Sequence, residues 1–413
     1  GRRRSTEAWV GWSSPLANLE FEFAARTADM NVSAIREILK VVSRPGIVSL
    51  AGGIPSPDSF PMDSMETLVA RVSERYGSNA LQYDLTEGFP ALRQALSGWL
   101  AANGLVADAD EILVASGSQG VLDGIGKVLV NPGDLVAVEA PTYLGALQAF
   151  SPYQPAYVEI ATDEDGVVPE ALDAVVANQP VKLVYLVPTF QNPTGRTIPM
   201  ARRRQIAEII ERNGVLLIED DPYSALRFRG EELPSIRSLA PDNVVYISTL
   251  SKVFAPGLRI GYAVVPPGLR EWMVIAKQGV DLHTSTFNQA LAAEYIGGGY
   301  LAAQIPKIVD LYRPKLEQML RALSEDMPDG FTWSTPDGGM FVWVEGPAGF
   351  DMDPVYERSV AAGAAFVPGK YFFAGGRAGR EAMRLNFTTA SCEQIGQAVA
   401  IIGAAIEAEL PAR

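Results

Sequence analysis

The chain has 413 residues, 48% of them hydrophobic and 20% charged, so it is long and apolar enough to form two or three globular domains. Its 48 acidic and 34 basic residues give a formal charge of -14, which opposes binding to nucleic acid. A single cysteine, Cys392, and a single histidine, His283, provide neither a disulfide framework nor a Cys/His metal cluster. We therefore expect a cytoplasmic protein that binds no metal.

The N-terminal sixty residues are irregular and rich in proline and glycine, as in "LAGGIPSPDSFP". The basic residues Arg2–Arg4 are not followed by an apolar stretch, so no secretory leader is expected. The apolar run at 398–406 is far shorter than the roughly 20 residues that cross a bilayer, so no membrane partner is expected either. We expect residues 1–60 to lie over a domain junction and to contribute to a substrate site.

Short apolar runs alternate with helical patterns from residue 111 onward. Helices are predicted at 118–130, 143–151 and 200–213, and such alternation is typical of βαβ units. The predicted strands are "EILVAS", "DLVAVEA", "KLVYLVP", "VLLIEDD", "NVVYIST" and "IGYAVVP". The predicted fold class is α/β, with a mostly parallel central sheet flanked by helices.

The helix predicted at 200–213 has a clear amphipathic pattern. Ile206 and Ile210 share one face, and Gly214 follows as a stop signal. The three arginines at 202–204 are expected to face solvent on this helix.

A different pattern begins near residue 301. A long helix to about 327 precedes the strand-like "GGMFVWVE", a helix at 354–363 and the strand "MRLNFT". In a terminal helix Ile395, Val399, Ile402 and Ile406 recur at helical spacing and should be buried. This pattern predicts a smaller α+β domain. The predicted units are residues 1–60, a large domain at 61–304 and a small domain at 305–413.

Polar residues follow several predicted strands, where a parallel sheet binds ligands. "EILVA" leads into Ser116-Gly-Ser-Gln-Gly120 and then a helix, which would direct backbone N–H groups at a phosphate. Alone, such a turn is more often structural. The GxGxxG and GxxxxGK[ST] motifs are absent from the sequence, which argues against a binding site for a dinucleotide or a nucleoside triphosphate.

Lys252 follows the strand "NVVYIST" in the stretch "SKVFAPGLR". A lysine at the end of a buried strand is uncommon because an unpaired buried ammonium costs several kcal/mol. Condensation with an aldehyde would neutralise it, so Lys252 is a candidate Schiff-base lysine.

Three groups of residues resemble one known family. Asn192-Pro-Thr-Gly195, Asp220 with Tyr223, and Ser251-Lys252 with Arg259 resemble, in order and spacing, the class I aminotransferases of the fold-type I pyridoxal-phosphate enzymes. The resemblance covers nearly the whole chain. Within that class, "AGGIPSPDSFP", "LQYDLTEG" and "GGMFVWVE" are similar to the α-aminoadipate and kynurenine aminotransferase branch.

The resemblance implies a role for each residue around pyridoxal 5'-phosphate. Lys252 would bind the cofactor covalently and move the Cα proton of the substrate. Asp220 would face the pyridine nitrogen and keep it protonated. Tyr223 and Asn192 would hydrogen-bond the phenolic oxygen, and Tyr143 would stack on the ring.

The resemblance also implies a phosphate site and a substrate site. Tyr83 would complete the phosphate site of a second subunit in a homodimer. Arg384 would bind the substrate α-carboxylate together with Asn192, while Gly52 and Gly53 would leave room for substrate. The implied phosphate ligands from the same chain are Ser118, Gln119, Thr249, Ser251 and Arg259.

The choice of amino acid depends on the N-terminal segment around Asp29. Relatives that take acidic substrates tend to have an arginine where Asp29 stands, and an aspartate would repel a distal carboxylate. We therefore expect an amino donor with a basic, aromatic or large neutral side chain and a 2-oxo acid acceptor. Arg26, three residues away, keeps a diacid donor open.

Two other functions are compatible with these motifs. Decarboxylases, lyases and oxidases on the same fold use the same lysine and aspartate. A ligand-sensing module, like the aminotransferase-like half of certain bacterial transcription regulators, is the second alternative, which the acidic charge disfavours.

Overall fold

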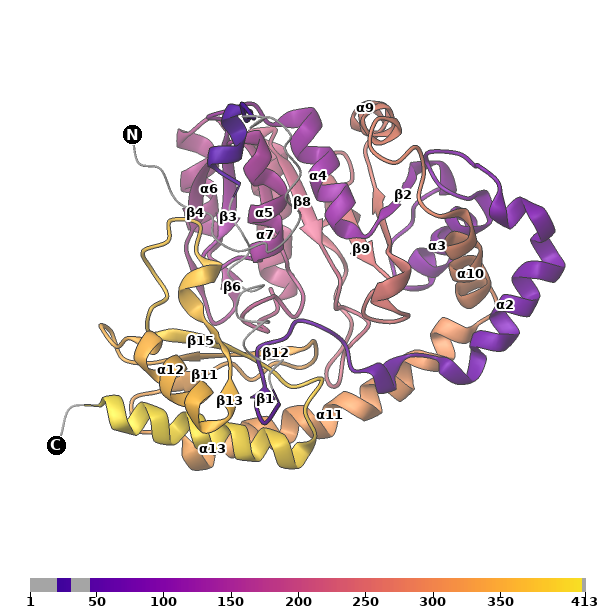
Figure 1. Cartoon of the computed structure of the whole chain (residues 1–413). Coiled ribbons are helices and arrows are strands. Elements are labelled where there is room, and N and C mark those ends of the chain that lie inside the picture. The colour runs from indigo at the N-terminus through magenta and orange to yellow at the C-terminus, as the bar shows by residue number, and fades with distance from the viewer. Residues whose placement is uncertain (1–20, 31–44, 411–413) are drawn as a thin grey trace, which may run out of the picture.

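A seven-stranded sheet forms the centre of the computed structural model, which describes residues 21–30 and 45–410 (Figure 1). Its strand order is β2-β10-β9-β8-β7-β3-β4. The strands are β2 (Ile112–Ser116), β3 (Leu135–Glu139), β4 (Ala156–Ile160), β7 (Val181–Leu186), β8 (Leu216–Asp220), β9 (Val244–Thr249) and β10 (Ile260–Val264).

Most neighbours in this sheet run parallel. Strands β9, β8, β7, β3 and β4 pair in parallel, whereas β10 is antiparallel to both β9 and β2. The prediction of a mostly parallel sheet is confirmed. Because parallel strands need crossover connections, helices follow them along the chain. These helices are α4 (Ser118–Leu129), α5 (Leu144–Phe150), α6 (Pro169–Asn178), α7 (Met200–Asn213) and α8 (Ile236–Leu239).

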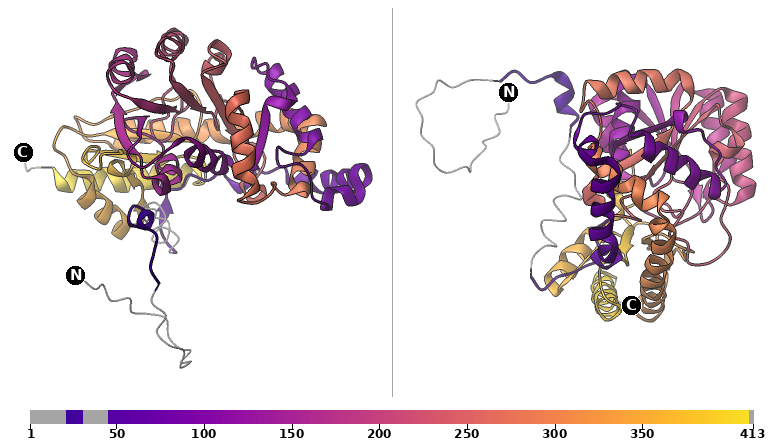
Figure 2. Two further views of the ribbon diagram at one scale, coloured as in Figure 1. Left: turned by 90° about the horizontal axis from the view of Figure 1, so that it is seen from above. Right: turned by 90° about the vertical axis from the view of Figure 1, so that its right-hand side faces the viewer.

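Both faces of the sheet are covered by helices, as Figures 1 and 2 show. Strand β7 illustrates this, because its side chains alternate between two apolar clusters. Leu183 and Tyr185 pack into the cluster that contains residues of α4 and α5. Val184 and Leu186 pack into the cluster that contains residues of α6 and α7. The continuous apolar run in β7 follows from this burial on both faces.

Helix α7 has the predicted bounds and ends at Gly214, which has a φ of 63°. The expectation that its arginines face solvent is wrong for Arg203, which is 1% exposed. The Arg203 guanidinium donates to the carbonyl oxygen of Ile198 at 2.8 Å and to the Thr189 hydroxyl at 2.7 Å, and it contacts two further carbonyl groups. These acceptors lie on loops that fold over the helix, so the helical pattern alone did not predict the burial.

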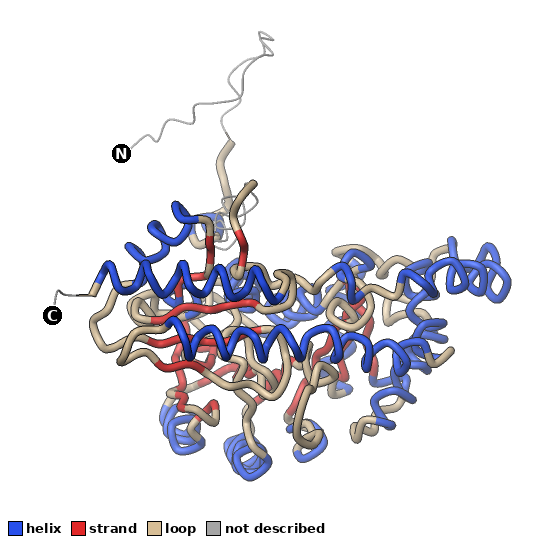
Figure 3. Tube along the Cα trace, turned by 90° about the horizontal axis from the view of Figure 1, so that it is seen from below, coloured by secondary structure: helices blue, strands red, loops and turns tan. Residues whose placement is uncertain are grey.

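A second sheet is antiparallel and has the order β11-β12-β15-β14. Its strands are β11 (Thr332–Trp333), β12 (Phe341–Glu345), β15 (Ala382–Asn386) and β14 (Val367–Pro368). Helices α11 (Tyr300–Asp326) and α13 (Cys392–Glu409) run side by side in this region, together with α12 (Met352–Ala362) (Figure 3). The four isoleucine and valine residues predicted to be buried in the terminal helix are buried in α13.

The remaining elements connect these two parts. Strand β1 (Val48–Ser49) pairs with β13 (Ala364–Ala365), so the N-terminal segment joins the region of the second sheet. Helices α2 (Met62–Tyr76), α3 (Pro90–Ala102) and α10 (Thr286–Gly297) pack together, while α9 (Pro267–Gln278) contacts α4. The hairpin β5 (Thr162–Asp163) and β6 (Gly166–Val167) completes the strands. Among the described helices, none has the length and apolarity needed to span a bilayer.

Candidate active site

A cavity of about 390 Å³ lies beyond the carboxyl ends of the parallel strands, where sheets of this kind bind ligands. Its lining combines residues of the large sheet, the N-terminal segment and strand β15. The sequence-predicted residues among them are Gly53, Ser118, Gln119, Tyr143, Asn192, Asp220, Tyr223, Thr249, Ser251, Lys252, Arg259 and Arg384.

Lys252 lies three residues after the end of β9 and points into this cavity. Its Nζ donates a hydrogen bond to the carbonyl oxygen of Gly53 at 2.9 Å. Burial lowers the pKa of Lys252 to about 8, and the positive charges of Arg384 and Arg259 act in the same direction. An amine with this pKa is partly uncharged near neutral pH and can act as a nucleophile or base.

Asp220 is the last residue of β8 and is 2% exposed. The Tyr185 hydroxyl donates to its Oδ2 at 2.7 Å, whereas its buried Oδ1 has no hydrogen-bond partner among the described residues. Burial raises the pKa of Asp220 to about 7, the Tyr185 hydrogen bond opposes this shift, and the charge of Asp221 adds to it. The free oxygen is therefore suited to an N–H donor of a ligand in the cavity.

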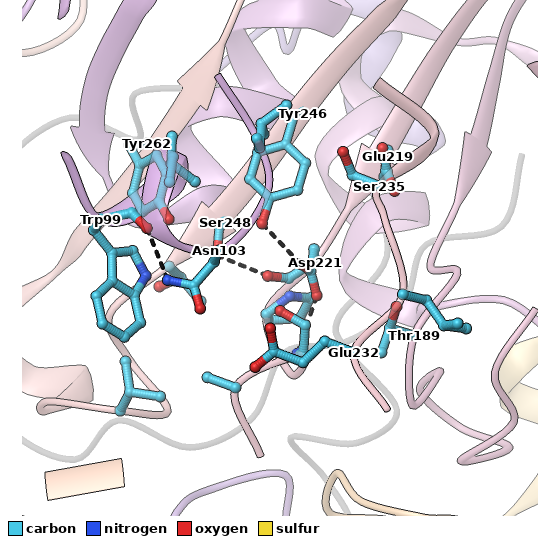
Figure 4. A pocket seen from close by; sticks show the side chains of 18 of the residues that line it. Trp99, Asn103, Thr189, Glu219, Asp221, Glu232, Ser235, Tyr246, Ser248 and Tyr262 are labelled. Carbon is cyan, nitrogen blue, oxygen red and sulfur yellow. Dashed lines mark hydrogen bonds between the residues drawn. The ribbon is translucent and has the colours of Figure 1, made fainter. Parts of the chain in front are cut away.

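The acidic residues on either side of Asp220 have different partners. Figure 4 shows Asp221 beside Tyr246 and Ser248, in a pocket separate from the cavity that Asp220 lines. Tyr246 donates its hydroxyl proton to Asp221 Oδ2 at 2.7 Å, and the backbone N–H of Ser224 donates to Oδ1 at 3.1 Å. Glu219 accepts two backbone N–H groups at the start of α8. Thus only Asp220 of the three acids faces the cavity.

Arg384 lies on β15 and brings a buried guanidinium to the cavity from the second sheet. It donates to Asn192 Oδ1 at 2.9 Å and to the Ala51 carbonyl oxygen at 2.8 Å. Its guanidinium carbon lies 4.3 Å from the centre of the Phe341 ring. Burial lowers the pKa of Arg384 to about 10, which still leaves it charged near neutral pH. Its Nε has no partner among the described residues, so a carboxylate can still be bound.

The loop that carries Asn192 touches the second sheet. Asn192 Nδ2 also donates to the Tyr223 hydroxyl, at 3.5 Å. Gly195 has a φ of 70°, and a Cβ at this position would overlap the carbonyl oxygen of Phe341. Glycine is therefore required for the loop to approach β12 this closely.

A third part of the cavity contains hydroxyl groups and a cation. The Thr249 hydroxyl donates to Ser251 Oγ at 2.9 Å. The Arg259 guanidinium lies against Gly117, directly before the first turn of α4, which begins at Ser118. Hydroxyl groups, a guanidinium and a helix N-terminus together are suited to a phosphate.

Two predicted site residues lie elsewhere in this chain. Tyr83 is 77% exposed, and its ring lies edge-on to His283 with 5.7 Å between the ring centres. Asp29 is exposed and accepts a hydrogen bond from Gln154 Nε2 at 2.7 Å. Neither residue lines the cavity. Gly52 does not line it either, and the roles of all three stay predictions.

Several contributions to the cavity were missed at the level of sequence. Tyr185 supports Asp220, and its hydroxyl within the apolar run "KLVYLVP" was a signal, because a buried tyrosine normally has a hydrogen-bond partner. Leu144 and Gln148 are four residues apart on α5 and both line the cavity, as does Ile54. No motif distinguished these three residues.

The residues of the cavity fit pyridoxal phosphate. The unpartnered Asp220 Oδ1 can accept from a protonated ring nitrogen, and the Arg259 region can hold a phosphate. Lys252 provides an amine of lowered pKa. A second unpartnered atom, Arg384 Nε, fits the carboxylate of an amino acid.

Comparisons with known proteins identify the family of this chain. The family model for aminotransferase class I and II matches residues 46–402. The chain is 42% identical to aromatic-amino-acid aminotransferase 1 of Thermococcus litoralis, over 96% of this chain and 97% of the relative. It is 37% identical to the 2-aminoadipate transaminase of Thermus thermophilus, over 93% and 96% of the two chains. A solved kynurenine aminotransferase of Pyrococcus horikoshii is similar with a TM-score of 0.91 and 42% identity, covering 94% of this chain and 98% of that one.

Proposed function

The chain belongs to the class I and II aminotransferases and is a pyridoxal-phosphate-dependent enzyme, and on this premise we propose its substrates and the roles of its residues. The reaction moves an amino group from an L-amino acid to a 2-oxo acid by a ping-pong mechanism. The preferred donor has an aromatic or large neutral side chain.

Three polar residues of the cavity, Lys252, Asp220 and Arg384, have separate tasks in this reaction. When bound, the cofactor supplies a ring that withdraws electrons from the bonds at the substrate Cα. Lys252 Nζ would take the proton from the substrate Cα and pass it on as the amino group is transferred, since its lowered pKa keeps part of the amine uncharged. Asp220 Oδ1 accepts the hydrogen bond of the ring nitrogen, and Arg384 holds the α-carboxylate.

The single observation that carries the proposal is the position of Arg384. Its guanidinium reaches the cavity that contains Lys252 from another sheet and has an unpartnered Nε. The unpartnered N–H of this buried arginine favours a further acceptor, for which a carboxylate is a strong one, and the α-carboxylate is common to all amino acid and 2-oxo acid substrates.

The preference for a neutral side chain is supported by the cavity lining. Among the described residues that line it, the cationic side chains are Lys252, Arg259 and Arg384. All three have roles with the cofactor or the α-carboxylate, so none remains for a distal carboxylate. The expected preference for basic donors depended on Asp29, which lies against Gln154, and it stays a prediction.

A panel of amino donors tests the proposal. The cofactor-loaded protein is mixed with each donor without an acceptor, and the change in its visible absorbance is followed. Conversion of the pyridoxal to the pyridoxamine form by aromatic or large neutral donors is the expected result. Release of ammonia or carbon dioxide in place of this conversion would identify a lyase, oxidase or decarboxylase and overturn the proposal.

A diacid donor is the second candidate function. The relative from Thermus thermophilus is named a 2-aminoadipate transaminase, and Arg26 is a cation in the 3-10 helix Ala25–Ala28. The same donor panel on Arg26→Gln decides this point. If Arg26 binds a distal carboxylate, the variant loses activity with 2-aminoadipate and glutamate while aromatic donors are unaffected.

We also propose that the enzyme is a cytoplasmic homodimer. Support comes from exposed apolar side chains near Tyr83, since Leu81 is 79% and Leu85 is 49% exposed. In this arrangement Tyr83 binds the phosphate in the partner subunit.

A further inference from the structure

Two buried polar residues lie next to the cavity without lining it. Glu139, the last residue of β3, is 1% exposed, and Gln191, in the loop after β7, is 4% exposed. A buried carboxyl group and a buried amide are unfavourable unless their hydrogen bonds are made, so their partners indicate their purpose.

Glu139 uses one oxygen to bind two donors. Its Oε2 accepts from the backbone N–H of Val187 at 2.9 Å and from Gln191 Nε2 at 3.1 Å. Burial raises the pKa of Glu139 to about 8, and the two donors oppose the shift. The group makes no salt bridge with any described residue, which distinguishes it from a charge-pairing carboxylate.

Gln191 connects Glu139 to two loops. Its Nε2 also donates to the Pro141 carbonyl oxygen at 2.8 Å. Its Oε1 accepts from the Thr194 hydroxyl at 2.6 Å and from the Thr194 backbone N–H at 3.1 Å. The Gln191 side chain therefore links the turn after β3 to the loop after β7. Its amide group donates hydrogen bonds through Nε2 and accepts them through Oε1.

These two loops carry residues of the active site. Tyr143 lies two residues after Pro141, and Asn192 directly follows Gln191. Asn192 in turn contacts Arg384 at 2.9 Å and Tyr223 at 3.5 Å. Phe190, on the other side of Gln191, is a non-glycine residue with a φ of 48°, and a residue in such a conformation persists only where surrounding contacts hold it.

We propose that Glu139 and Gln191 are positioning residues that fix Tyr143 and Asn192 relative to each other. The inference deepens the proposed function and rests on it, because Asn192 is taken to contact both the cofactor and the arginine that binds the α-carboxylate. Loss of the link shifts Asn192, so Arg384 binds both substrates less well and the cofactor oxygen loses a donor.

The test compares variants that keep or remove the hydrogen bonds. Glu139→Gln retains an oxygen that can accept from both donors, whereas Glu139→Leu and Gln191→Leu remove the link. We expect Gln191→Leu to raise KM for the amino donor and the 2-oxo acid by about tenfold or more, with kcat changed less. Its visible cofactor absorbance should titrate at a different pH, and its cofactor should dissociate faster. Glu139→Gln should keep the wild-type KM, absorbance titration and cofactor dissociation rate, whereas Glu139→Leu should change all three.

Glu294→Gln provides the control for a general loss of stability. Glu294 is also buried, but it pairs with Arg71 and Arg75 on α2, away from the cavity. This variant should lower the unfolding temperature without changing KM or the titration. Folded Gln191→Leu and Glu139→Leu proteins with wild-type KM, titration and cofactor dissociation would overturn the inference.

The outcomes also separate this inference from the proposed function. If the wild-type protein moves no amino group, the proposed function fails, while the titration and dissociation of the cofactor still test the positioning role. If the wild type transaminates and the leucine variants match it, only the positioning role fails.

Discussion

Asp220 has one carboxylate oxygen bound by Tyr185 and another without a partner among the described residues. A buried polar atom that lacks a hydrogen-bond partner is characteristic of residues kept for function rather than for stability. The raised pKa of about 7 turns this feature into a measurable effect on unfolding.

Replacement of Asp220 by asparagine should stabilise the cofactor-free protein at alkaline pH. The ordinary pKa of 3.8 is raised to about 7, so the stability due to protonated Asp220 is full below pH 3.8 and is lost as pH rises through 7. Asp220→Asn should therefore unfold at a higher temperature at pH 8, with a gain of up to about 4 kcal/mol that disappears toward pH 4. Thermal unfolding at several pH values measures this. Glu208→Gln, at an exposed site, is the control, and an equal gain at all pH values would contradict the explanation.

Lys252 should react with aldehydes at lower pH than an ordinary lysine. Its pKa of about 8 lies below the ordinary value of 10.5, so the uncharged amine is half formed near pH 8. We expect alkylation of the cofactor-free protein by a small aldehyde and a hydride reductant, located by peptide mass spectrometry, to reach half its maximal rate near pH 8. Because the charge of Arg259 lowers this pKa, Arg259→Gln should move the midpoint upward. A wild-type midpoint near 10.5 would refute the prediction.

The position of chemistry-bearing residues at strand ends could be predicted from the sequence, since Asn192, Asp220 and Lys252 follow recognisable strands. The buried residues that hydrogen-bond to these side chains or their loops without lining the cavity could not be predicted. Tyr185 binds Asp220, which is 35 residues away in the chain, and Gln191 binds Glu139, which is 52 residues away. No spacing rule connects such pairs.

At the scale of elements, strand β10 and helix α4 meet at Gly261. A Cβ on Gly261 would overlap the backbone of Gly117 and Ser118, at the start of α4. The antiparallel direction of β10 allows this contact while Arg259, just before the strand, lies against Gly117.

Gly261→Ala should separate α4 from β10 and weaken the binding of the cofactor phosphate. We expect the cofactor to dissociate at least about tenfold faster, because displacement by about 1 Å at a binding group has large effects. Gly257→Ala is the matched control, since an added Cβ there meets nothing within 4 Å. Absorbance during dialysis measures the loss, and equal rates for the two variants would argue against the contact.

Helix α7 shows what an element's sequence could and could not predict. The periodicity of Ile206 and Ile210 and the stop at Gly214 fixed its bounds, because these signals are local. The burial of Arg203 depends on acceptors in loops after β7 and before α8, which no local pattern contains. Likewise, β4 and the reversed direction of β10 were not predicted.

For the whole molecule, the exposed surface around Tyr83 leads to a prediction about assembly. Leu81→Arg places a charge among exposed apolar side chains and should shift the protein toward a monomer in sedimentation experiments. If the partner's phosphate site needs Tyr83, this monomer also retains its cofactor less well.

Tyr83→Phe separates the two effects, because it removes only the hydroxyl group. Tyr83→Phe should leave the dimer intact in sedimentation experiments and should weaken the retention of the cofactor. Unchanged retention in a stable dimer would remove Tyr83 from the phosphate site.

The central sheet and a smaller α+β region were predicted from the sequence because their patterns differ, whereas β11 and β14 of the second sheet were not. The domain limits stay a prediction, and the expected boundary at 304/305 lies within helix α11. How the N-terminal segment uses Asp29 was not predictable, since its partner Gln154 is 125 residues away.

The three consecutive arginines of α7 lie in three different environments. Three identical residues follow one another, yet Arg204 is exposed, Arg202 is half-buried beside Asp163 and Arg203 is enclosed by oxygen acceptors. In a saturation mutagenesis screen, position 204 should accept most amino acids and position 202 many. Position 203 should reject even lysine, whose single ammonium cannot reach acceptors spread across two loops. Tolerance to mutation would thus vary from permissive to strict within one turn of helix, in a stretch where the letters of the sequence are the same.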